Sequence, residues 1–439
     1  MKSLAVFLAA IPSLAMAPHG LAAGAPAPQA DGWRPFEVIE AVPSPLGSRV
    51  TLHSQILDAD VTMNLYVPES FGVSSAEHTY PVIFIQGEHG EQFFHALVGM
   101  VKHLGDRERV PESIVVSLND IGAIPDVYTN GMWPAERIPG FGAPDQDVRH
   151  LRDEVIPFLE STYRANAYRM IVGVSGSGLF PIYAFTHAPE LFRSYVLIAA
   201  ADMVGMGYRP GESFVDAFDE RLAADSTRSV SLYLGVADAD LDGRPDYRAN
   251  LDAMARLKRH EQLDLEVEVF ADEDHYAVFL PAMLAAFDQS FPYEKWSARY
   301  RDLVAQPGDA LDNIDRYYQE LSREYGFAIL PRADRWNNVN SLRFLIRHLI
   351  RLERTGEAVR VAERRAQYRP GTLEALQGLV DAYEADGRVA AAIEAQEKAV
   401  ERARTVGVGD VEDLEARLLS LKALADSNLA QDPTGPVPR

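Results

Sequence analysis

The sequence predicts an α/β fold, a mostly parallel eight-stranded sheet flanked by helices, followed by an all-helical region. Three observations predict it. Short β-rich segments alternate with helical patterns from Arg49 onward, and the central β-rich segments are continuously apolar. After Pro292 the chain becomes charged, helical and rich in alanine. Alternating strands and helices favour a parallel sheet with helices on both faces, and continuously apolar strands are typical of its centre.

The expected strands can be followed in order along the chain. The first two, 49–57 and 61–67, are separated by a spacing typical of a hairpin. Helical patterns lie between the later strands, as where Val148, Leu151 and Val155 recur at spacings of three and four. The six further strands are expected at 81–85, 113–116, 170–174, 194–198, 230–234 and 265–270. In such sheets the functional site forms at the carboxyl ends of the strands.

Length and composition limit the classes of protein that the chain can represent. Its 439 residues suffice for two or three domains, each with its own core. The net charge of −22 disfavours binding to nucleic acid or to an anionic membrane. The absence of cysteine excludes disulfides, thiolate metal sites and a cysteine nucleophile.

Residues 1–23 have the pattern of a signal peptide. Lys2 supplies a positive charge, residues 4–17 are mostly apolar, and residues 21–23 form a small-residue cleavage site. The apolar run is too short for a membrane span. We therefore expect export to the periplasm or out of the cell, with a membrane anchor or a disordered N-terminus as alternatives. Residues 24–45 are expected to form a linker.

The end of the fifth expected strand and the residues that follow it read Gly173-Val-Ser175-Gly176-Ser177-Gly178. A strand, a sharp turn and a helix in this order are typical of the nucleophile elbow of α/β-hydrolases, which holds a serine at its apex. Small neighbours are needed there because the serine occupies a strained backbone conformation. Ser177 stands where the G-x-S-x-G motif has its second glycine. The pattern predicts Ser175 as a nucleophile; a Gly/Ser-rich loop is the alternative.

The partners of such a serine follow it in the order acid, then histidine. His275 comes directly after the last expected strand, where it can reach over the sheet edge and take the proton of Ser175. The acid is expected after strand 230–234, with Asp238 as the first choice and Asp240 as the second. A solvated histidine in an acidic loop is the alternative for His275.

The same acidic loop supports a competing interpretation. Residues 238–243, Asp-Ala-Asp-Leu-Asp-Gly, match the opening of a calcium-binding loop, and Asp246 falls at its ninth position. The twelfth position, which needs a bidentate glutamate, is Ala249, and a strand rather than a helix enters the loop. Calcium is therefore the minor alternative, a solvated acidic turn is a third, and the predicted chemistry requires no metal or cofactor.

An oxyanion hole needs two backbone N–H donors near the serine. The N–H of Gly176, at the start of the helix that follows Ser175, is the first candidate. The loop 86–90 follows the third expected strand and can supply the second, through Gly87 or Glu88. A simple strand-to-helix turn is the alternative for this loop.

Taken together, residues 46–290 resemble the putative-esterase family of α/β-hydrolases, which includes ferric-enterobactin esterases. The matching stretches are 80–88, 152–164, 173–179, 187–192 and 273–275. The resemblance implies Ser175 as nucleophile and His275 as base. It also implies that Gly87 and Gly176 lie at the oxyanion hole. In the siderophore branch of the family, serine and histidine can work as a dyad without an acid.

The C-terminal part is expected to be helical over residues 293–425. Two similar stretches there contain Gly356 and Gly387, which lie 387 − 356 = 31 residues apart, close to the roughly 34-residue period of a tetratricopeptide repeat. Such a region could bind a protein partner or shape the rim of the active site. A helical cap packed on the preceding domain is the alternative. Residues 426–439, with three prolines, are expected to form a disordered tail.

The leading prediction is therefore an exported serine esterase whose esterase domain spans residues 46–292. It would hydrolyse a small-molecule carboxylic ester through an acyl-serine, with a Ser-His-Asp triad or a Ser-His dyad. Two alternatives remain from the sequence. The same acyl-enzyme could pass its acyl group to an alcohol, as an acyltransferase does, or the fold could be a non-catalytic binding scaffold.

Overall fold

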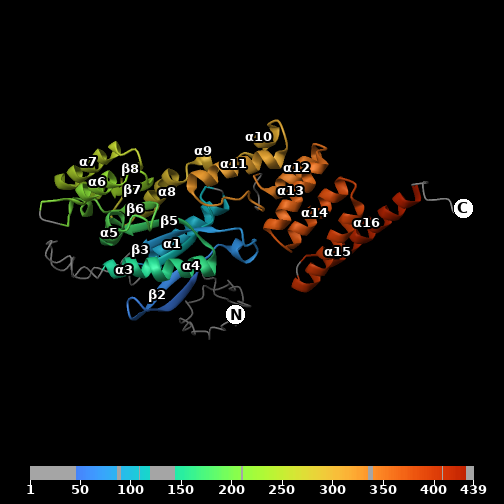
Figure 1. The fold of residues 1–439 in the computed structure, drawn as a ribbon, viewed down its shortest axis with the longest axis horizontal. Helices are drawn as coiled ribbons and strands as arrows, with labels where there is room; N and C mark the ends of the chain where they lie inside the picture. Colours follow the sequence, from blue (N-terminus) through green and yellow to red (C-terminus); the bar gives the residue numbers. More distant parts are fainter. Residues whose placement is uncertain are drawn as a thin grey trace, which may run out of the picture. The chain divides into compact units, whose positions relative to one another are not determined.

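The computed structural model describes residues 46–86, 90–107, 109–118, 144–208, 211–334, 340–407 and 409–431. These residues contain an eight-stranded sheet with the strand order β1-β2-β4-β3-β5-β6-β7-β8 (Figure 1). The strands are β1 (Ser48–Ser54), β2 (Ala59–Tyr66), β3 (Tyr80–Gln86), β4 (Ile114–Leu118), β5 (Ala165–Val174), β6 (Ser194–Ile198), β7 (Val230–Ala237) and β8 (Leu263–Phe270). The β1–β2 and β2–β4 pairs are antiparallel and the others are parallel, so the predicted mostly parallel sheet is confirmed.

The central strands are buried on both faces, which explains their continuously apolar sequences. Along β3, Val82 and Phe84 belong to one hydrophobic core and Ile83 and Ile85 to the other, because successive side chains point to opposite faces of a sheet. Every residue of β4 and of β6 is buried. The sheet therefore holds the carboxyl ends of β5, β6 and β7 on a rigid support.

Helices cover both faces of this sheet. Apolar residues of α1 and α8 pack in one core, and those of α4, α5, α6 and α7 pack in the other. The helices in this part are α1 (Gly90–Asp106), α3 (Pro144–His150), α4 (Ile156–Tyr163), α5 (Leu179–His187), α6 (Phe214–Ala224), α7 (Pro245–Ala255) and α8 (Phe279–Ser290). This arrangement of sheet and helices is that of an α/β-hydrolase fold, as the sequence predicts.

A buried polar cluster fastens the β1–β2 hairpin to the helical segment before α4. The carboxylate of Glu154 accepts hydrogen bonds from the Ser54 hydroxyl at 2.6 Å and from the Gln55 backbone N–H at 2.8 Å. Its Oε2 also lies 2.5 Å from His150 Nδ1. Glu154 belongs to a short π-helical turn, Leu151–Val155, that joins α3 to α4. His150 and Glu154 are four residues apart, so they lie on the same face of this helical segment and both contact the hairpin residue Ser54.

The last strand, β8, forms one edge of the sheet. Asp264, Glu266 and Glu268 alternate along it and therefore share one face. Desolvation raises the pKa of Glu266, and the neighbouring carboxylates of Glu268 and Asp264 raise it further. The hydroxyl of Tyr233, on β7, donates to Glu268 at 3.0 Å. The outer strand thus carries a row of acidic side chains.

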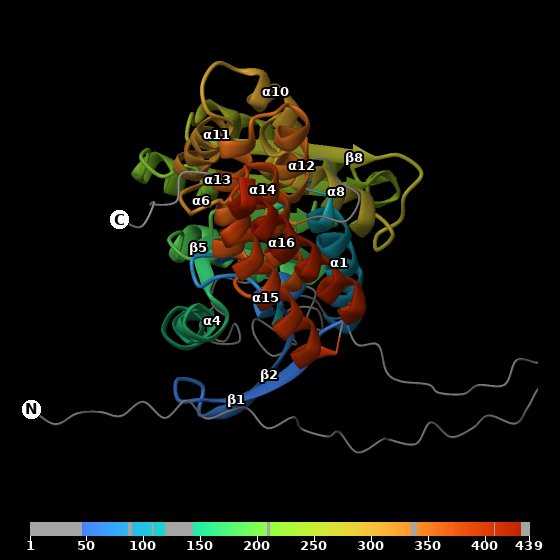
Figure 2. The ribbon, with the colours of Figure 1, turned by 90° about the vertical axis from the view of Figure 1, so that its right-hand side faces the viewer.

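The C-terminal part is helical, as predicted, and consecutive helices from α12 onward pack against one another (Figures 1 and 2). Its helices are α9 (Tyr293–Trp296), α10 (Tyr300–Ala305), α11 (Ala310–Tyr325), α12 (Leu342–Arg351), α13 (Thr355–Tyr368), α14 (Leu373–Ala385), α15 (Val389–Val406) and α16 (Val411–Gln431). Residues 426–431, assigned to the tail from the sequence, belong to α16, and 432–439 lie outside the described residues. Gly356 lies in the first turn of α13 and Gly387 between α14 and α15; a tetratricopeptide repeat stays a prediction. Within the described ranges, no helix is long and apolar enough to cross a bilayer.

An arginine is buried among these helices. Arg365, on α13, is 2% exposed, and its Nε donates to Asp334 at 2.9 Å. Its Nη1 donates to the backbone carbonyl of Glu374 at 2.5 Å. A Cβ atom at Gly378, on α14, would lie 2.6 Å from this Nη1. The absence of a side chain at Gly378 therefore makes room for the guanidinium between α13 and α14.

Candidate active site

Ser175 lies at a sharp turn between β5 and α5. Val174 still has an extended backbone, whereas Ser175 has φ 54° and begins the short 3₁₀ turn Ser175–Gly178 that leads into α5. A positive φ is strained for a residue with a side chain. A Cβ atom at Gly173 would lie 2.6 Å from the Gly178 Cα, so the turn requires glycine there. This backbone is that of a nucleophile elbow.

The serine that replaces the second motif glycine is part of the turn. Ser177 is 8% exposed, and its hydroxyl accepts a hydrogen bond from the Val174 N–H at 2.8 Å. The same hydroxyl donates to the Val174 carbonyl at 2.7 Å. The side chain is thus folded back on the end of β5 instead of occupying the space above the turn. Ser177 therefore fits the elbow by hydrogen bonding to its backbone.

His275 contacts Ser175 through one ring nitrogen and Asp240 through the other. Its Nε2 lies 2.8 Å from the Ser175 Oγ, and its Nδ1 lies 3.0 Å from each carboxylate oxygen of Asp240. The His275 side chain is 39% exposed and that of Asp240 is 19% exposed. The three side chains come from the carboxyl ends of β5, β7 and β8, and we call them the relay. The structure thus brings the predicted serine and histidine together.

The predicted first-choice acid, Asp238, is not part of the relay, and this assignment is corrected. Its Oδ2 accepts a hydrogen bond from the backbone N–H of Asp272 at 3.1 Å. Asp238 and Asp240 both lie in the 3₁₀ turn Asp238–Leu241 that follows β7. With three residues per turn, side chains two positions apart point in different directions. Only the second of these carboxylates contacts the imidazole, so the contacts favour Asp240, the second choice, over Asp238.

The loop that carries His275 is held by its own polar groups. The carboxylate of Asp274 accepts hydrogen bonds from the backbone N–H of Ala277 at 2.9 Å and of Tyr276 at 3.1 Å. These two bonds lower the pKa of Asp274. The ring of Tyr276 lies edge-on to the imidazole of His275, with the centroids 4.7 Å apart. The turn made by Asp274 and the ring of Tyr276 therefore help to hold the imidazole in place.

Two carboxylates of the alternative calcium-binding loop have partners within the protein. The first two carboxylates of the proposed calcium loop, Asp238 and Asp240, contact Asp272 and His275 respectively. Across the ranges that the structure describes, no group of three or more histidine, aspartate or glutamate side chains is placed to hold a metal ion.

Of the two predicted oxyanion donors, Gly176 and Gly87, the structure describes Gly176 alone. Gly176 is buried and directly follows Ser175 in the 3₁₀ turn that continues into α5. Its N–H is thus one of the first of a helical run, where backbone donors lack intrahelical partners. Gly87 lies outside the described residues, as does Glu88. The complete oxyanion hole stays a prediction.

A cavity of about 270 Å³ lies beside the relay. Its polar lining residues are Asp202, Asp240, Asp242, Arg244, Tyr247 and His275. Asp202 did not figure in the sequence analysis, although it follows the buried strand β6 and the sheet rule places such a residue at the functional edge. Arg244 and Tyr247 belong to the loop and helix after β7, and only the fold brings them to His275.

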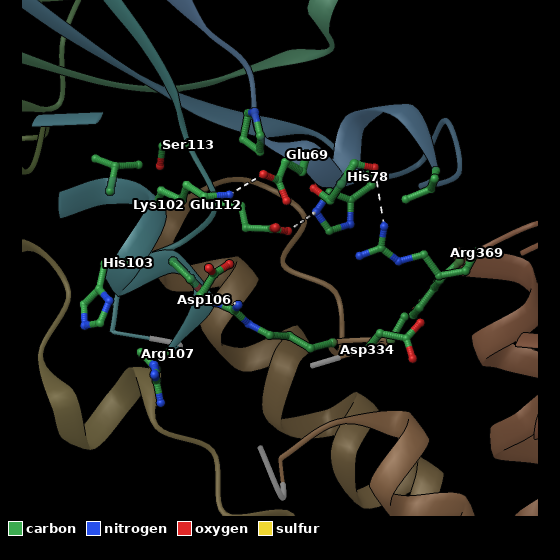
Figure 3. A pocket seen from close by; sticks show the side chains of 18 of the residues that line it. Glu69, His78, Lys102, His103, Asp106, Arg107, Glu112, Ser113, Asp334 and Arg369 are labelled. Atoms are coloured by element: carbon green, nitrogen blue, oxygen red, sulfur yellow. Dashed lines mark hydrogen bonds and ion pairs between the residues drawn. The ribbon is translucent and has the colours of Figure 1, made fainter. Parts of the chain in front are cut away.

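A larger cavity, about 600 Å³, lies elsewhere (Figure 3). His78 and Glu112, which line it, come just before β3 and β4. The cavity therefore lies at the amino ends of these parallel strands, whereas Ser175 follows the carboxyl end of β5. His78 Nε2 lies 3.7 Å from Glu112 Oε2, and Lys102 is paired with Glu69. Burial lowers the pKa of His78 to about 4, so its imidazole is neutral at neutral pH. This cavity contains no member of the relay.

Comparison with known proteins agrees with the fold. A family model described as "Putative esterase" matches residues 54–297, more than half of the chain. An IroE-like serine hydrolase from Shewanella oneidensis is 19% identical over 73% of this chain and 98% of its own, with a TM-score of 0.55. An uncharacterised protein from Capnocytophaga ochracea is 16% identical over 86% of this chain and 99% of its own, with a TM-score of 0.50. The second match is longer than the α/β part and so includes C-terminal helices. Among curated proteins, none matches the chain.

At these identities the solved structures establish the fold alone. The match to the family model establishes that the chain belongs to the family. The match of residues 54–297 includes the elbow and the loop of His275. The chain therefore belongs to the esterase family of α/β-hydrolases, and it is an enzyme that acts on ester bonds.

Proposed function

We propose that this protein is an exported serine esterase in which Ser175, His275 and Asp240 carry out the reaction. The observation that carries the proposal is the continuous relay, with 2.8 Å between Ser175 Oγ and His275 Nε2 and 3.0 Å between His275 Nδ1 and Asp240. The positive φ of Ser175 supports it, because strained backbone at a nucleophile is characteristic of the elbow.

The relay supplies an activated nucleophile. With its proton on Nδ1, His275 donates to Asp240 and leaves the Nε2 lone pair facing the Ser175 hydroxyl. Ser175 Oγ attacks the ester carbonyl carbon while its proton moves to His275 Nε2. Asp240 then stabilises the imidazolium, and the backbone N–H of Gly176, the residue after Ser175, donates to the oxyanion.

The second half of the reaction regenerates the enzyme. When the tetrahedral intermediate collapses, the bond to the alcohol breaks and the alcohol takes the proton from His275 Nε2, leaving an acyl-serine. Water attacks this acyl group, gives a proton to His275, and the carboxylic acid leaves as Ser175 recovers its proton. Transfer of the acyl group to an alcohol instead of water stays an alternative from the sequence.

Labelling with a fluorophosphonate probe tests the proposed nucleophile. The full chain should form one adduct, located on Ser175 by mass spectrometry, and Ser175→Ala should abolish it. His275→Ala should slow labelling strongly, whereas Ser161→Ala, an exposed serine on α4, should leave it unchanged. The rate of hydrolysis of 4-nitrophenyl butyrate should likewise be abolished in Ser175→Ala, strongly lowered in His275→Ala and unchanged in Ser161→Ala. A folded protein that is not labelled, or that is still labelled after Ser175→Ala, contradicts the proposal.

Export is supported by the signal-peptide pattern of residues 1–23. Expression of the full chain in a bacterium with a periplasm, followed by fractionation and N-terminal sequencing, tests it. Export predicts a periplasmic or secreted protein that begins at Gly24. An uncleaved protein in the cytoplasmic fraction contradicts it.

A further inference from the structure

The proposed reaction leaves two carboxylates of the active-site cavity without a task, the exposed Asp242 and the half-buried Asp202. Asp202 follows β6, is half-buried, and lines the cavity beside His275. Among the described residues its carboxylate makes no hydrogen bond or ion pair with another side chain; its polar contacts are to the backbone at Met203 and at its own residue. Burial raises its pKa, and the charge of Asp240 adds to the rise while His275 opposes it. Burial of a charged carboxylate without a side-chain partner costs free energy unless another group binds it.

The one arginine of the cavity lining contacts the neutral side chain of Tyr247 and, among the described residues, makes no hydrogen bond or ion pair with Asp202. Arg244 Nη1 donates to the Tyr247 hydroxyl at 2.8 Å, and its guanidinium lies 5.0 Å from the Tyr247 ring centroid. The imidazole of His275 is similarly engaged with Asp240. Asp242 adds a further carboxylate to the lining, so acidic groups outnumber the arginine. A cavity with this balance attracts cations and repels anions.

We propose that Asp202 is a specificity-determining residue that binds a protonated amine of the substrate. This inference rests on the proposed esterase function and names its substrate class, an ester that carries an ammonium group in the part occupying the cavity. An ammonium donates a charge-assisted hydrogen bond to the carboxylate and offsets its desolvation, which a methyl group of the same size cannot do. An anionic ester would place two like charges in one small cavity.

Two isosteric series of esters separate charge from shape. On the acyl side, the 4-nitrophenyl esters of 4-(dimethylamino)butanoic, 5-methylhexanoic and glutaric acid carry a cation, no charge and an anion. On the alcohol side, the butanoates of 3-(dimethylamino)propanol and 4-methylpentanol form a matched pair. The tertiary amine cannot form a stable lactam, and the rate of hydrolysis of each ester without enzyme is measured and subtracted. We expect the full-length enzyme to prefer the cationic ester over the neutral one by about tenfold in kcat/KM in at least one series.

The variants identify the residue responsible. Asp202→Asn should bring the cation-to-neutral ratio close to one and improve hydrolysis of the glutaric ester. Asp202→Glu, which keeps the charge, should keep the direction of the preference. Asp252→Asn, an exposed carboxylate on α7, controls for the overall field and should leave the ratio unchanged. Urea unfolding confirms that each variant is folded.

The results distinguish this inference from the function on which it rests. Equal hydrolysis of cationic and neutral esters, or a preference that persists in Asp202→Asn, overturns the role of Asp202 and leaves the esterase standing. Failure of the wild-type protein to hydrolyse any of the esters, together with absence of fluorophosphonate labelling, contradicts both.

Discussion

The carboxylate of Asp238 accepts a hydrogen bond from the backbone N–H of Asp272, 3.1 Å away. Asp272 has φ 61° and lies in the turn that leads from β8 to His275. Two carboxylates of one short loop therefore have separate tasks. Asp238 holds the turn that presents the histidine, and Asp240 contacts the imidazole itself.

Substitution of the two aspartates should separate these tasks. Asp240→Asn should lower kcat by about 10⁴-fold, because an amide cannot stabilise the imidazolium and favours the wrong tautomer. Asp238→Asn should lower it by about tenfold or less, because the amide oxygen can still accept the Asp272 N–H. Steady-state hydrolysis of 4-nitrophenyl butyrate measures both. Equal losses in the two variants would contradict the assignment of Asp240 as the acid.

Ser177→Ala should destabilise the protein by about 1–3 kcal/mol, because the buried polar groups of Val174 lose their hydroxyl partner. The free energy of unfolding in urea measures the effect. Ser161→Ala, which removes an exposed hydroxyl bonded to the Pro157 carbonyl, is the matched control and should change it little. Equal stabilities for the two variants would show that the Ser177 hydroxyl does not support the elbow.

Glu154 should make stability depend on pH. Partial burial raises its pKa, but hydrogen bonds from Ser54, His150 and the backbone of Gln55 and Ile56 outweigh this and lower the pKa to about 2. The ionised carboxylate thus stabilises the fold fully above its ordinary pKa of 4.5, and the contribution is lost as the pH falls from 4.5 towards 2.

Urea unfolding at several pH values tests this dependence. Glu154→Gln should be less stable than the wild type at pH 7 and should lose less stability over the acidic window. Glu160→Gln removes a carboxylate from the neighbouring helix α4 and should keep the wild-type pH dependence. If Glu154→Gln follows the wild-type curve, its carboxylate does not hold the hairpin.

Asp334→Ala should destabilise the protein by about 3–5 kcal/mol, because the buried guanidinium of Arg365 would lose its counter-charge. The double variant Asp334→Ala/Arg365→Met should recover part of this loss, because the buried charge is then absent. A double-mutant cycle of unfolding free energies measures the coupling. A double variant no more stable than Asp334→Ala would mean that the guanidinium contributes mainly by packing.

The sequence was sufficient to predict that Ser175 and His275 lie side by side, because their positions depend on chain order. An elbow after the fifth strand and a histidine after the eighth meet at one edge once the sheet forms. It was not sufficient to choose between Asp238 and Asp240. Their directions depend on the 3₁₀ turn after β7, and the sequence alone does not determine which residue of such a turn faces the imidazole.

The cavity shows a second limit of the same kind. Asp202 could have been singled out as the first carboxylate after β6, because polar groups at strand ends gather at the functional edge. That its carboxylate has no side-chain partner among the described residues depends, however, on where Arg244 lies, and the contact of Arg244 with Tyr247 forms only when the chain folds. Which charges are compensated by neighbours is thus a property of the folded loops.

The acidic row on β8 has a consequence for how copies of this molecule behave at high concentration. An unpaired edge strand is a template on which another strand can add, and such pairing begins many aggregates. If two β8 edges met, the carboxylates of Asp264, Glu266 and Glu268 would face like charges. Electrostatic repulsion thus opposes pairing of two such edges, and it weakens in acid once Glu266, whose pKa is raised by burial, takes up a proton.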